Sequence, residues 1–360
     1  MRGKSRTTLK DVARAVGVNV STVSRALNAD STHRVSEALA AKIRAASRRL
    51  KYSPNTAASS LRTARTRTVG VIVPDITDPA YPPIIRGIED ALATHGYVAI
   101  LANTDGDARR QERIIETLRA RSVDGLILAT IARADSAMVR LAGELPLVTV
   151  VRASDDARIA SVVHDEEDGI RRILTHLVSH EHREIAMIAG PQMLSTGFRR
   201  LRAFEQQRKA LGLARTKPNV AFAGAFNESE GERCAEELLA RGQAFTALMC
   251  ANDRLAVGAI AALRRHGLRC PEDVSVTGYN DMPLADRLLP PLTTVRVQHH
   301  KGGFESAELI VELMRERRNA SVRHASVRHV VLPVEIVIRG STQRLGRQSR
   351  KRALAGATSS

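Results

Sequence analysis

Apolar residues near the start of the chain recur at α-helical spacing in two short stretches separated by one glycine. The first stretch follows Thr8, a helix-capping residue with Asp11 three positions on as its capping-box partner. Gly17 permits the tight turn that ends a helix, and Asn19 can cap the next one. The pattern predicts a helix-turn-helix unit, with these inward-facing residues: Leu9, Val12, Ala13, Val16, Val23, Ala26 and Leu27. A third helix is expected after Ser36, with Ile43, Ala46 and Leu50 facing inward.

From residue 69 the pattern changes to strands alternating with amphipathic helices. Continuous apolar runs such as VGVIVPD (69–75) and LPLVTVV (145–151) are typical of buried parallel strands. The alternation restarts with SVVHD (161–165) and continues to VSVTGYND (274–281). We therefore expect an all-α headpiece followed by an α/β core of two doubly wound parallel-sheet lobes. Ligands of such sheets bind beyond the carboxyl ends of the strands, where these polar residues stand: Asp75, Asn103, Asp165, Asn252, Asp253, Asn280 and Asp281.

The net charge of +17 is concentrated at the two ends of the 360-residue chain. Residues 1–68 hold 15 Lys and Arg against 3 Asp and Glu, residues 343–360 hold 5 against none, and the middle is neutral. A polyanionic partner for the first segment is the direct inference. The outward face of the predicted second helix carries small hydroxyl residues and Arg25, which suit phosphates and base edges.

The composition otherwise indicates an ordinary globular protein. Three scattered cysteines support neither a disulfide framework nor a zinc site. The first residues lack the apolar run of a secretory signal, and no apolar stretch approaches the length of a membrane span. We expect a cytoplasmic, nucleoid-associated protein without a cofactor or metal. His164, His299 and His300 are read as structural or solvated, because no carboxylate or cysteine stands at a metal-ligand spacing.

The segment KYSPNTAASSLRTARTRT (51–68) favours a short, weak helix capped by Asn55 after Pro54. One interpretation is a flexible basic linker. The other is a helix that folds only on a partner copy and on DNA, with Leu61 as a wedge in the minor groove.

LKDVARAVGVNVSTVSRALN followed by KYSPNTAASSLR resembles the headpiece and hinge of the lac repressor (LacI–GalR) family of bacterial transcription regulators. The resemblance implies that Val20 and Ser21 read bases, with Arg25 as a third reader, and that Leu61 opens a central base step. Val20 and Ser21 have small side chains. Val20 is expected to make an apolar contact with a base, such as with a thymine methyl group, and Ser21 a short polar contact. The full DNA-binding set is Thr8, Asn19, Val20, Ser21, Thr22, Ser24, Arg25, Asn28, Tyr52, Asn55, Ala57, Ala58 and Leu61.

The resemblance continues through DITDPAYPPIIRGIEDALATHGY (75–97) and residues 249–296, and VVLPVEIVIRGST is similar to the family's last strand. It implies the fold of periplasmic sugar-binding proteins, with a small effector between the lobes and three chain crossings between them. The resemblance implies that Arg200 is a charged clamp for a hydroxyl or carboxylate of the effector. Asn252 and Asn280 would hydrogen-bond the polar edge of the effector, and Tyr81 and Phe226 would present flat faces to a sugar or base ring. Asp165 and Thr196 are second-rank candidates. The family often has an acidic residue in place of Asn280 and paired aromatics in place of Ala80 and Tyr81, so effector identity does not transfer.

These observations together predict the division of the chain and its function. The expected parts are a headpiece (1–52), a hinge (53–67), an effector-binding and dimerisation core (68–342) and a basic, disordered tail (343–360). Phosphate-loop, dinucleotide, nucleophile-elbow and zinc-protease motifs are absent from the sequence, so we expect no enzyme. We expect a repressor that binds pseudo-palindromic operator DNA as a homodimer and responds to a sugar-like effector. The alternatives are a nonspecific nucleoid-type binder, or a sensor whose nucleobase or nucleoside ligand acts as a corepressor.

Overall fold

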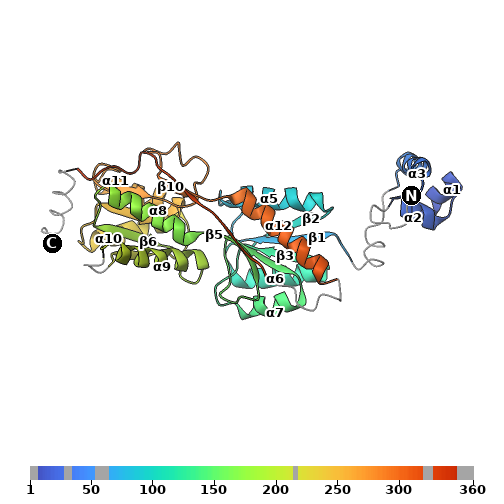
Figure 1. Ribbon diagram of the computed structural model, residues 1–360, viewed down its shortest axis with the longest axis horizontal. Helices are drawn as coiled ribbons and strands as arrows, with labels where there is room; N and C mark the ends of the chain where they lie inside the picture. The colour runs from blue at the N-terminus through green and yellow to red at the C-terminus, as the bar shows by residue number, and fades with distance from the viewer. Residues whose placement is uncertain (1–6, 28–34, 53–64, 214–217, 319–326, 347–360) are drawn as a thin grey trace, which may run out of the picture. The chain divides into compact units, whose positions relative to one another are not determined.

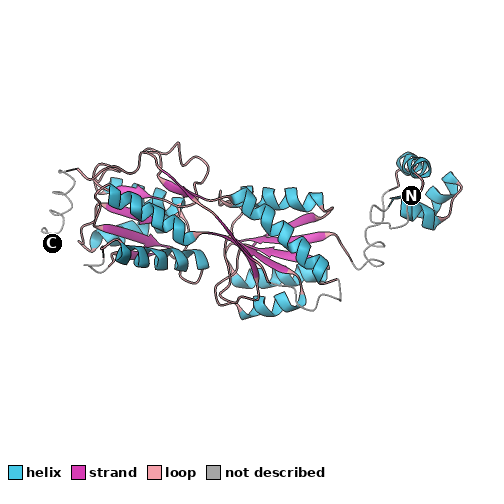
Figure 2. Cartoon of the chain, viewed as in Figure 1, coloured by secondary structure: helices cyan, strands magenta, loops and turns pink. Residues whose placement is uncertain are grey.

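The computed structural model describes residues 7–27, 35–52, 65–213, 218–318 and 327–346. The chain divides into two compact units, Met1–Thr66 and Arg67–Ser360. Figure 2 shows that the regular elements among the described residues of the first unit are helices, whereas the second unit combines helices with parallel strands. The expected fold class, a helical headpiece followed by an α/β core, is therefore confirmed.

The headpiece contains three described helices, α1 (Leu9–Val16), α2 (Val20–Leu27) and α3 (Glu37–Arg49). The Asp11 carboxylate accepts hydrogen bonds from the Thr8 backbone N–H (2.9 Å) and hydroxyl (2.7 Å), so the predicted capping interaction is present. Gly17 has φ +74°, the left-handed conformation that ends α1. Val12, Val23 and Ile43 are fully buried in the centre, each from a different helix. A small apolar core thus fixes the angle between the helices and leaves the opposite face of α2 exposed.

The first core lobe is a six-stranded parallel sheet with strand order β11-β5-β4-β3-β1-β2. Its strands are β1 (Thr68–Val73), β2 (Val98–Asn103), β3 (Gly125–Leu128), β4 (Leu147–Val150), β5 (Ala160–His164) and β11 (His329–Leu332). Helices α5 (Tyr81–Thr94) and α12 (His299–Glu316) cover one face, and α6 (Ala108–Ala120) and α7 (Ser136–Glu144) cover the other (Figure 1).

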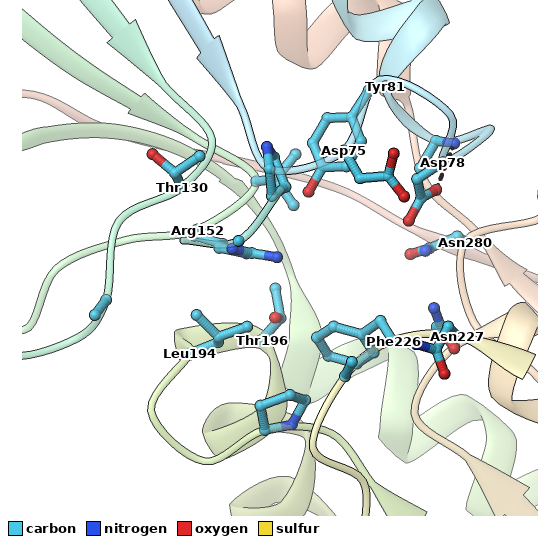
Figure 3. A pocket seen from close by; sticks show the side chains of 18 of the residues that line it. Asp75, Asp78, Tyr81, Thr130, Arg152, Leu194, Thr196, Phe226, Asn227 and Asn280 are labelled. Carbon is cyan, nitrogen blue, oxygen red and sulfur yellow. Dashed lines mark hydrogen bonds between the residues drawn. The ribbon is translucent and has the colours of Figure 1, made fainter. Parts of the chain in front are cut away.

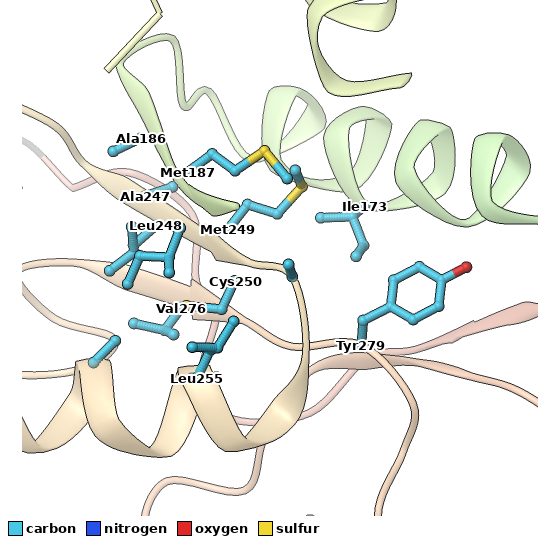
Figure 4. Packing of buried hydrophobic residues seen from close by; sticks show 14 of the residues in the cluster. Ile173, Ala186, Met187, Ala247, Leu248, Met249, Cys250, Leu255, Val276 and Tyr279 are labelled. Atoms are coloured by element: carbon cyan, nitrogen blue, oxygen red, sulfur yellow. The ribbon is translucent and has the colours of Figure 1, made fainter. Parts of the chain in front are cut away.

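The second core lobe has a four-stranded parallel sheet with strand order β7-β6-β8-β9. Its strands are β6 (Ile185–Ala189), β7 (Val220–Phe222), β8 (Ala247–Cys250) and β9 (Ser275–Thr277), and its helices are α8 (Glu166–Ser179), α9 (Ser195–Ala210), α10 (Glu228–Ala240) and α11 (Asp253–Arg265). An antiparallel pair, β10 (Thr294–Arg296) and β12 (Glu335–Val337), packs against α8. Figure 4 shows Met187, Met249 and Ile173 meeting in the buried layer between this sheet and α8.

The chain crosses between the lobes three times: from β5 to α8, from β10 to α12, and from β11 to β12. Each lobe is therefore assembled from separate segments, as the family resemblance implies. The crossings also bring the carboxyl ends of strands from both lobes to one place, which is where a ligand of this fold binds.

Three sequence expectations were wrong in detail. The run SVVHD does not start the second lobe, because β5 pairs with β4 in the first sheet. The segment VVLPVEIVIRGST is two strands in different sheets, divided at Pro333, which has no N–H to donate to a ladder. Helices α7 and α12 were not predicted. Helix α12 has Gly302 and Gly303 near its start, and Gly303 lies so close to the backbone of α5 that a Cβ would overlap it.

Candidate functional site

The exposed face of α2 presents the predicted base-reading residues. Val20 is 39% exposed although it is apolar, and Ser21 and Arg25 are exposed beside it. The Arg25 Nε donates to the Ser21 backbone oxygen at 3.3 Å, which holds this side chain along the exposed face of α2. Thr22 and Ser24 are half-buried along the edges of the helix. These side chains can therefore approach a nucleic acid while Val23 holds the helix on the headpiece core.

Other predicted DNA-binding residues fall into two groups. Thr8 and Asn19 are exposed just before the first turns of α1 and α2, and Tyr52 packs against the headpiece core. Helix starts of this kind are suited to phosphate groups, because their backbone N–H groups point outward. The remaining predicted residues lie outside the described residues: Asn28, Asn55, Ala57, Ala58 and Leu61.

The headpiece surface is strongly basic. Arg14 and Lys10 are exposed on α1, and α3 and its end carry further exposed cations: Lys42, Arg44, Arg48, Arg49 and Lys51. Among the described residues of the headpiece, ion pairs join only residues of the same helix, Arg14 with Asp11 and Arg44 with Glu37. Most of this charge therefore remains available for phosphates, which supply salt-sensitive affinity in protein–nucleic acid complexes.

The core contains a cavity of about 460 Å³ between its two lobes. Its wall is built from the loops that follow the strands and from the first turns of the helices after them, and Figure 3 shows side chains from both lobes facing each other across it. The volume lies within the range of about 300–1,000 Å³ that small-molecule sites occupy. Acidic, basic, amide and hydroxyl side chains all line it, so the cavity is suited to a polar ligand.

The structure brings the effector-site candidates together, with one exception. Tyr81 comes from the first lobe, and the second lobe contributes Thr196, Arg200, Phe226, Asn252 and Asn280, all of which line the cavity. Tyr81 and Phe226 approach it from opposite sides (Figure 3). Asp165 is not part of the lining. Its carboxylate instead accepts the Asp168 backbone N–H at 2.9 Å and caps α8.

Arg200, the predicted clamp, is already paired within the protein. It is 4% exposed, and its Nη2 lies 3.1 Å from Oε1 of Glu166, with Nε bonded to the other carboxylate oxygen. Its Nη1 donates to the Ala251 carbonyl, and the guanidinium lies 3.7 Å from the centre of the Tyr279 ring. Burial lowers the pKa of Arg200, but Glu166 and Tyr279 more than offset that effect and raise the pKa overall. Glu166 therefore neutralises this cation before any ligand arrives.

Arg152 is a cavity residue that the sequence reasoning missed. It lies two residues after the end of β4, and Figure 3 shows its side chain extending into the pocket. The preceding Val151 has φ +68°, a conformation that is rare for a β-branched residue. The signal was present in the sequence, because Arg152 is a charged residue directly after the predicted strand LPLVTVV.

Arg254 is a second missed residue, and it links the lobes. It stands at the start of α11, where it bonds Glu228 at 2.7 Å. Across the cavity it lies 3.9 Å from Asp75 and 3.7 Å from Asp78, which belong to the first lobe. Burial raises the pKa of the Asp78 carboxyl, although Arg254 acts in the opposite direction. These charges stabilise the lobes in their present arrangement.

Two of the three histidines noted in the sequence line the cavity. His164 is buried and His299 is half-buried, with ring centroids 6.3 Å apart, and desolvation lowers the pKa of each to about 4. Both rings are therefore neutral at neutral pH. His300 is exposed and bonds Asp90 at 2.9 Å. Across the described parts of the chain, no group of three His, Cys, Asp or Glu side chains is placed to hold a metal ion.

Within the described segments, no helix is long and apolar enough to cross a membrane.

Comparisons with known proteins agree with this geometry. Residues 8–55 match the model of bacterial regulatory proteins of the lacI family, and residues 174–342 match that of a periplasmic binding protein-like domain. The chain is 33% identical over 312 residues to the ribose operon repressor of Escherichia coli (strain K12), covering 86% of this chain and 92% of that protein. It is 31% identical over 314 residues to the HTH-type transcriptional repressor PurR of Aliivibrio fischeri (strain ATCC 700601 / ES114), with the same coverage.

Solved structures resemble this chain over more than nine-tenths of its length. The lac repressor dimer bound to operator and the anti-inducer ONPF has a TM-score of 0.81 and 27% identity, covering 94% of this chain and all of that one. The transcriptional regulator CelR in complex with cellobiose has a TM-score of 0.70 and 31% identity, covering 93% and 100%. Family models, relatives and structures all point to one assignment, and this chain belongs to the lacI family of bacterial regulatory proteins.

Proposed function

We propose that this protein is a transcriptional repressor that binds a pseudo-palindromic operator as a homodimer and changes its DNA affinity when a small molecule occupies the core cavity. One observation carries the proposal. A basic headpiece with an exposed α2 precedes a neutral core whose two lobes enclose a cavity of about 460 Å³. A headpiece alone would bind DNA, but only regulation by a ligand gives the core a role.

The DNA-reading half of the proposal rests on the face of α2. Val20, Ser21 and Arg25 are exposed there, and helices of this kind lie in the major groove. Small side chains at Val20 and Ser21 favour close approach to base edges, including thymine methyl groups, while Arg25 can reach a guanine or a phosphate. Two copies related by a two-fold axis would read a two-fold symmetric site.

The switching half rests on contacts that join the lobes. The Ala153 N–H donates to Ser195 Oγ at 2.9 Å, and Arg254 faces Asp78 from the other lobe. A ligand that contacts both walls favours one arrangement of the lobes over the others. It shifts the equilibrium between two arrangements only by the difference in its affinity for them. A coupling of about 1–3 kcal/mol, or roughly 5–150-fold in operator affinity, is sufficient for a switch.

For the effector we propose a sugar or sugar derivative. Several relatives carry names that point to sugars, such as the ribose operon repressor and the cellobiose-bound CelR. A nucleobase-like ligand is the second candidate, since Tyr81 and Phe226 offer flat faces on opposite walls. We expect the repressor to act in the cytoplasm, where operator DNA is found.

The test is selection of random duplex DNA on the purified full-length protein at moderate salt. Enrichment of a two-fold symmetric sequence is the expected result. A pool with no enriched sequence, with and without candidate sugars and nucleobases, would leave only nonspecific charge-driven binding and refute the proposal.

The hinge is tested on the enriched site. Leu61→Ala is expected to weaken operator binding and to blunt the effect of any ligand, because a smaller side chain cannot hold a base step open. A variant with unchanged affinity and unchanged ligand response would show that Leu61 is not a wedge.

A further inference from the structure

The charges that line the cavity are unequally compensated. Arg200 is paired with Glu166, and Arg254 with Glu228 and two first-lobe aspartates. Arg152 also lines the cavity, but no ion pair joins it to any other described residue. It is half-buried, and a half-buried guanidinium without a carboxylate partner is an effective site for an anion. Arg152 interacts with Asp78 over a longer distance, but no carboxylate of the described residues lies within ion-pair distance of its guanidinium, so this cation can still pair with a ligand.

The backbone at the end of β4 fixes the direction of this side chain. The Arg152 N–H donates to the Val150 carbonyl at 2.7 Å, which closes a three-residue turn around Val151. This turn requires the left-handed φ of +68° at a valine, a conformation that costs roughly 1–3 kcal/mol. The following Ala153 N–H is bonded to Ser195 Oγ in the second lobe. Arg152 is thus held between the end of a strand and the start of helix α9.

The first turn of α9 supplies further groups for an anion. The first backbone N–H groups of any α-helix lack an intrahelical acceptor. In this 16-residue helix the N-cap residue Leu194 provides no side-chain acceptor for them either. Leu194 and Thr196 both line the cavity. Thr196 is 4% exposed, and its hydroxyl has no hydrogen-bond partner among the described residues. Figure 3 shows Thr196 below Arg152 on the same side of the pocket, with Thr130 beyond them.

The opposite side of the cavity has a different chemistry. Figure 3 shows Asp75, Asp78, Asn227 and Asn280 gathered there, away from Arg152. Carboxylate and amide groups together donate to and accept from the hydroxyl groups of a polyol. Arg254 offsets part of the charge of the two aspartates, because it is also paired with Glu228.

We propose that the cavity binds a polyhydroxy anion, such as a sugar acid or a sugar phosphate. Its carboxylate or phosphate would be held by Arg152, the Thr196 hydroxyl and the first N–H groups of α9, and its hydroxyl groups by the acidic and amide end. This inference rests on the proposed function, because it names the chemical class of the effector that the switch responds to. It moves the charge recognition from Arg200, which is neutralised, to Arg152.

The experiment measures thermal unfolding of the full-length protein with matched compounds. The probes are glucose, galactose and ribose, the corresponding aldonic and uronic acids, the corresponding sugar phosphates, and inorganic phosphate. The variants are Arg152→Gln and, as a matched control, Arg158→Gln. Arg158 lies in the same loop, pairs with Asp156 and does not line the cavity. Titration calorimetry then gives the affinity of each compound that raises the midpoint.

At least one acid or phosphate is expected to raise the midpoint, whereas its neutral counterpart does not. Arg152→Gln should weaken that anion about 30-fold or more, the loss typical of removing one partner of a buried charge pair. The control Arg158→Gln should bind as the unmodified protein does. A response to carboxylates alone or to phosphates alone identifies the head group.

The inference is overturned if a neutral sugar stabilises the protein and Arg152→Gln binds it equally well, or if no anion in the panel distinguishes Arg152→Gln from the unmodified protein. Operator selection separates this failure from failure of the proposed function. A protein that still enriches a symmetric site remains a DNA-binding regulator with a different effector. A protein that enriches no site loses both proposals.

Discussion

The buried ion pair between Arg200 and Glu166 allows a sharp test of the structure of the second lobe. Both side chains are about 5% exposed, and they join α9 to the first turn of α8 through two hydrogen bonds. Glu166→Gln removes the negative charge and keeps the shape of the side chain. The Arg200 guanidinium then remains buried, with the Ala251 carbonyl and the Tyr279 ring as its other partners.

The expected cost follows from this geometry. Removing one partner of a buried pair typically destabilises a protein by about 3–5 kcal/mol, because the other charge stays away from water without compensation. Gln can still accept one hydrogen bond from Arg200, so the lower end of that range applies. For a core of this size, each kcal/mol lowers the unfolding midpoint by about 2–4 °C.

The measurement is thermal and urea unfolding of the full-length protein, followed by circular dichroism. Glu167→Gln is the matched control, since it makes the same chemical change one residue later, in the same helical turn, on an exposed side chain. The control also loses one favourable charge at the helix N-terminus, an effect of about 0.3–1 kcal/mol. The difference between the two variants therefore reports the buried pair.

Equal destabilisation by Glu166→Gln and Glu167→Gln would refute the reasoning. A second variant isolates the cause. Adding Arg200→Met to Glu166→Gln removes the uncompensated cation and should restore part of the lost stability, since an apolar side chain tolerates this site better than an unpaired charge.

Three further predictions concern other parts of the chain. Ile43→Ala should lower the unfolding free energy of the small headpiece by about 2–5 kcal/mol and unfold it. Operator binding should then be lost while the unfolding midpoint of the core stays unchanged, and retained binding would contradict this prediction. Gly258→Ala should lower the unfolding midpoint of the core, because the new Cβ would overlap a backbone carbonyl of α10. Gly143→Ala has open space around it and should raise stability by about 0.5–1 kcal/mol, so equal effects of the two variants would contradict the packing. Acidification from pH 6.5 to 4 should destabilise the core, because desolvation holds the pKa of His164 and His299 at about 4, so the unfolded chain takes up protons before the folded protein does. An unfolding midpoint of the core that does not fall across that pH range would contradict the desolvation of these two rings.

Much of the candidate site was predictable because it follows from local order along the chain. A polar residue directly after a buried strand in a parallel sheet must lie at the ligand-binding edge, and Asn252 and Asn280 were found in this way. Arg152 obeys the same rule and was within reach. Asp165 also obeys it but caps α8, and no spacing in the sequence distinguishes a capping carboxylate from one that faces a ligand.

The sequence by itself determined the helix-turn-helix, the basic charge of the first segment, the two-lobed α/β class and the positions of the strand ends. These features depend on spacing, capping and composition, which act over a few residues. Only the tertiary structure decided that β5 belongs to the first sheet, that Arg200 is neutralised by Glu166, and that Arg152 is left without an ion pair. Such outcomes depend on which segments pack together, and Arg200 and Glu166 meet across 34 residues because α9 packs on α8. The charge that a ligand encounters is what remains after the protein has paired its own, and that remainder is set by packing.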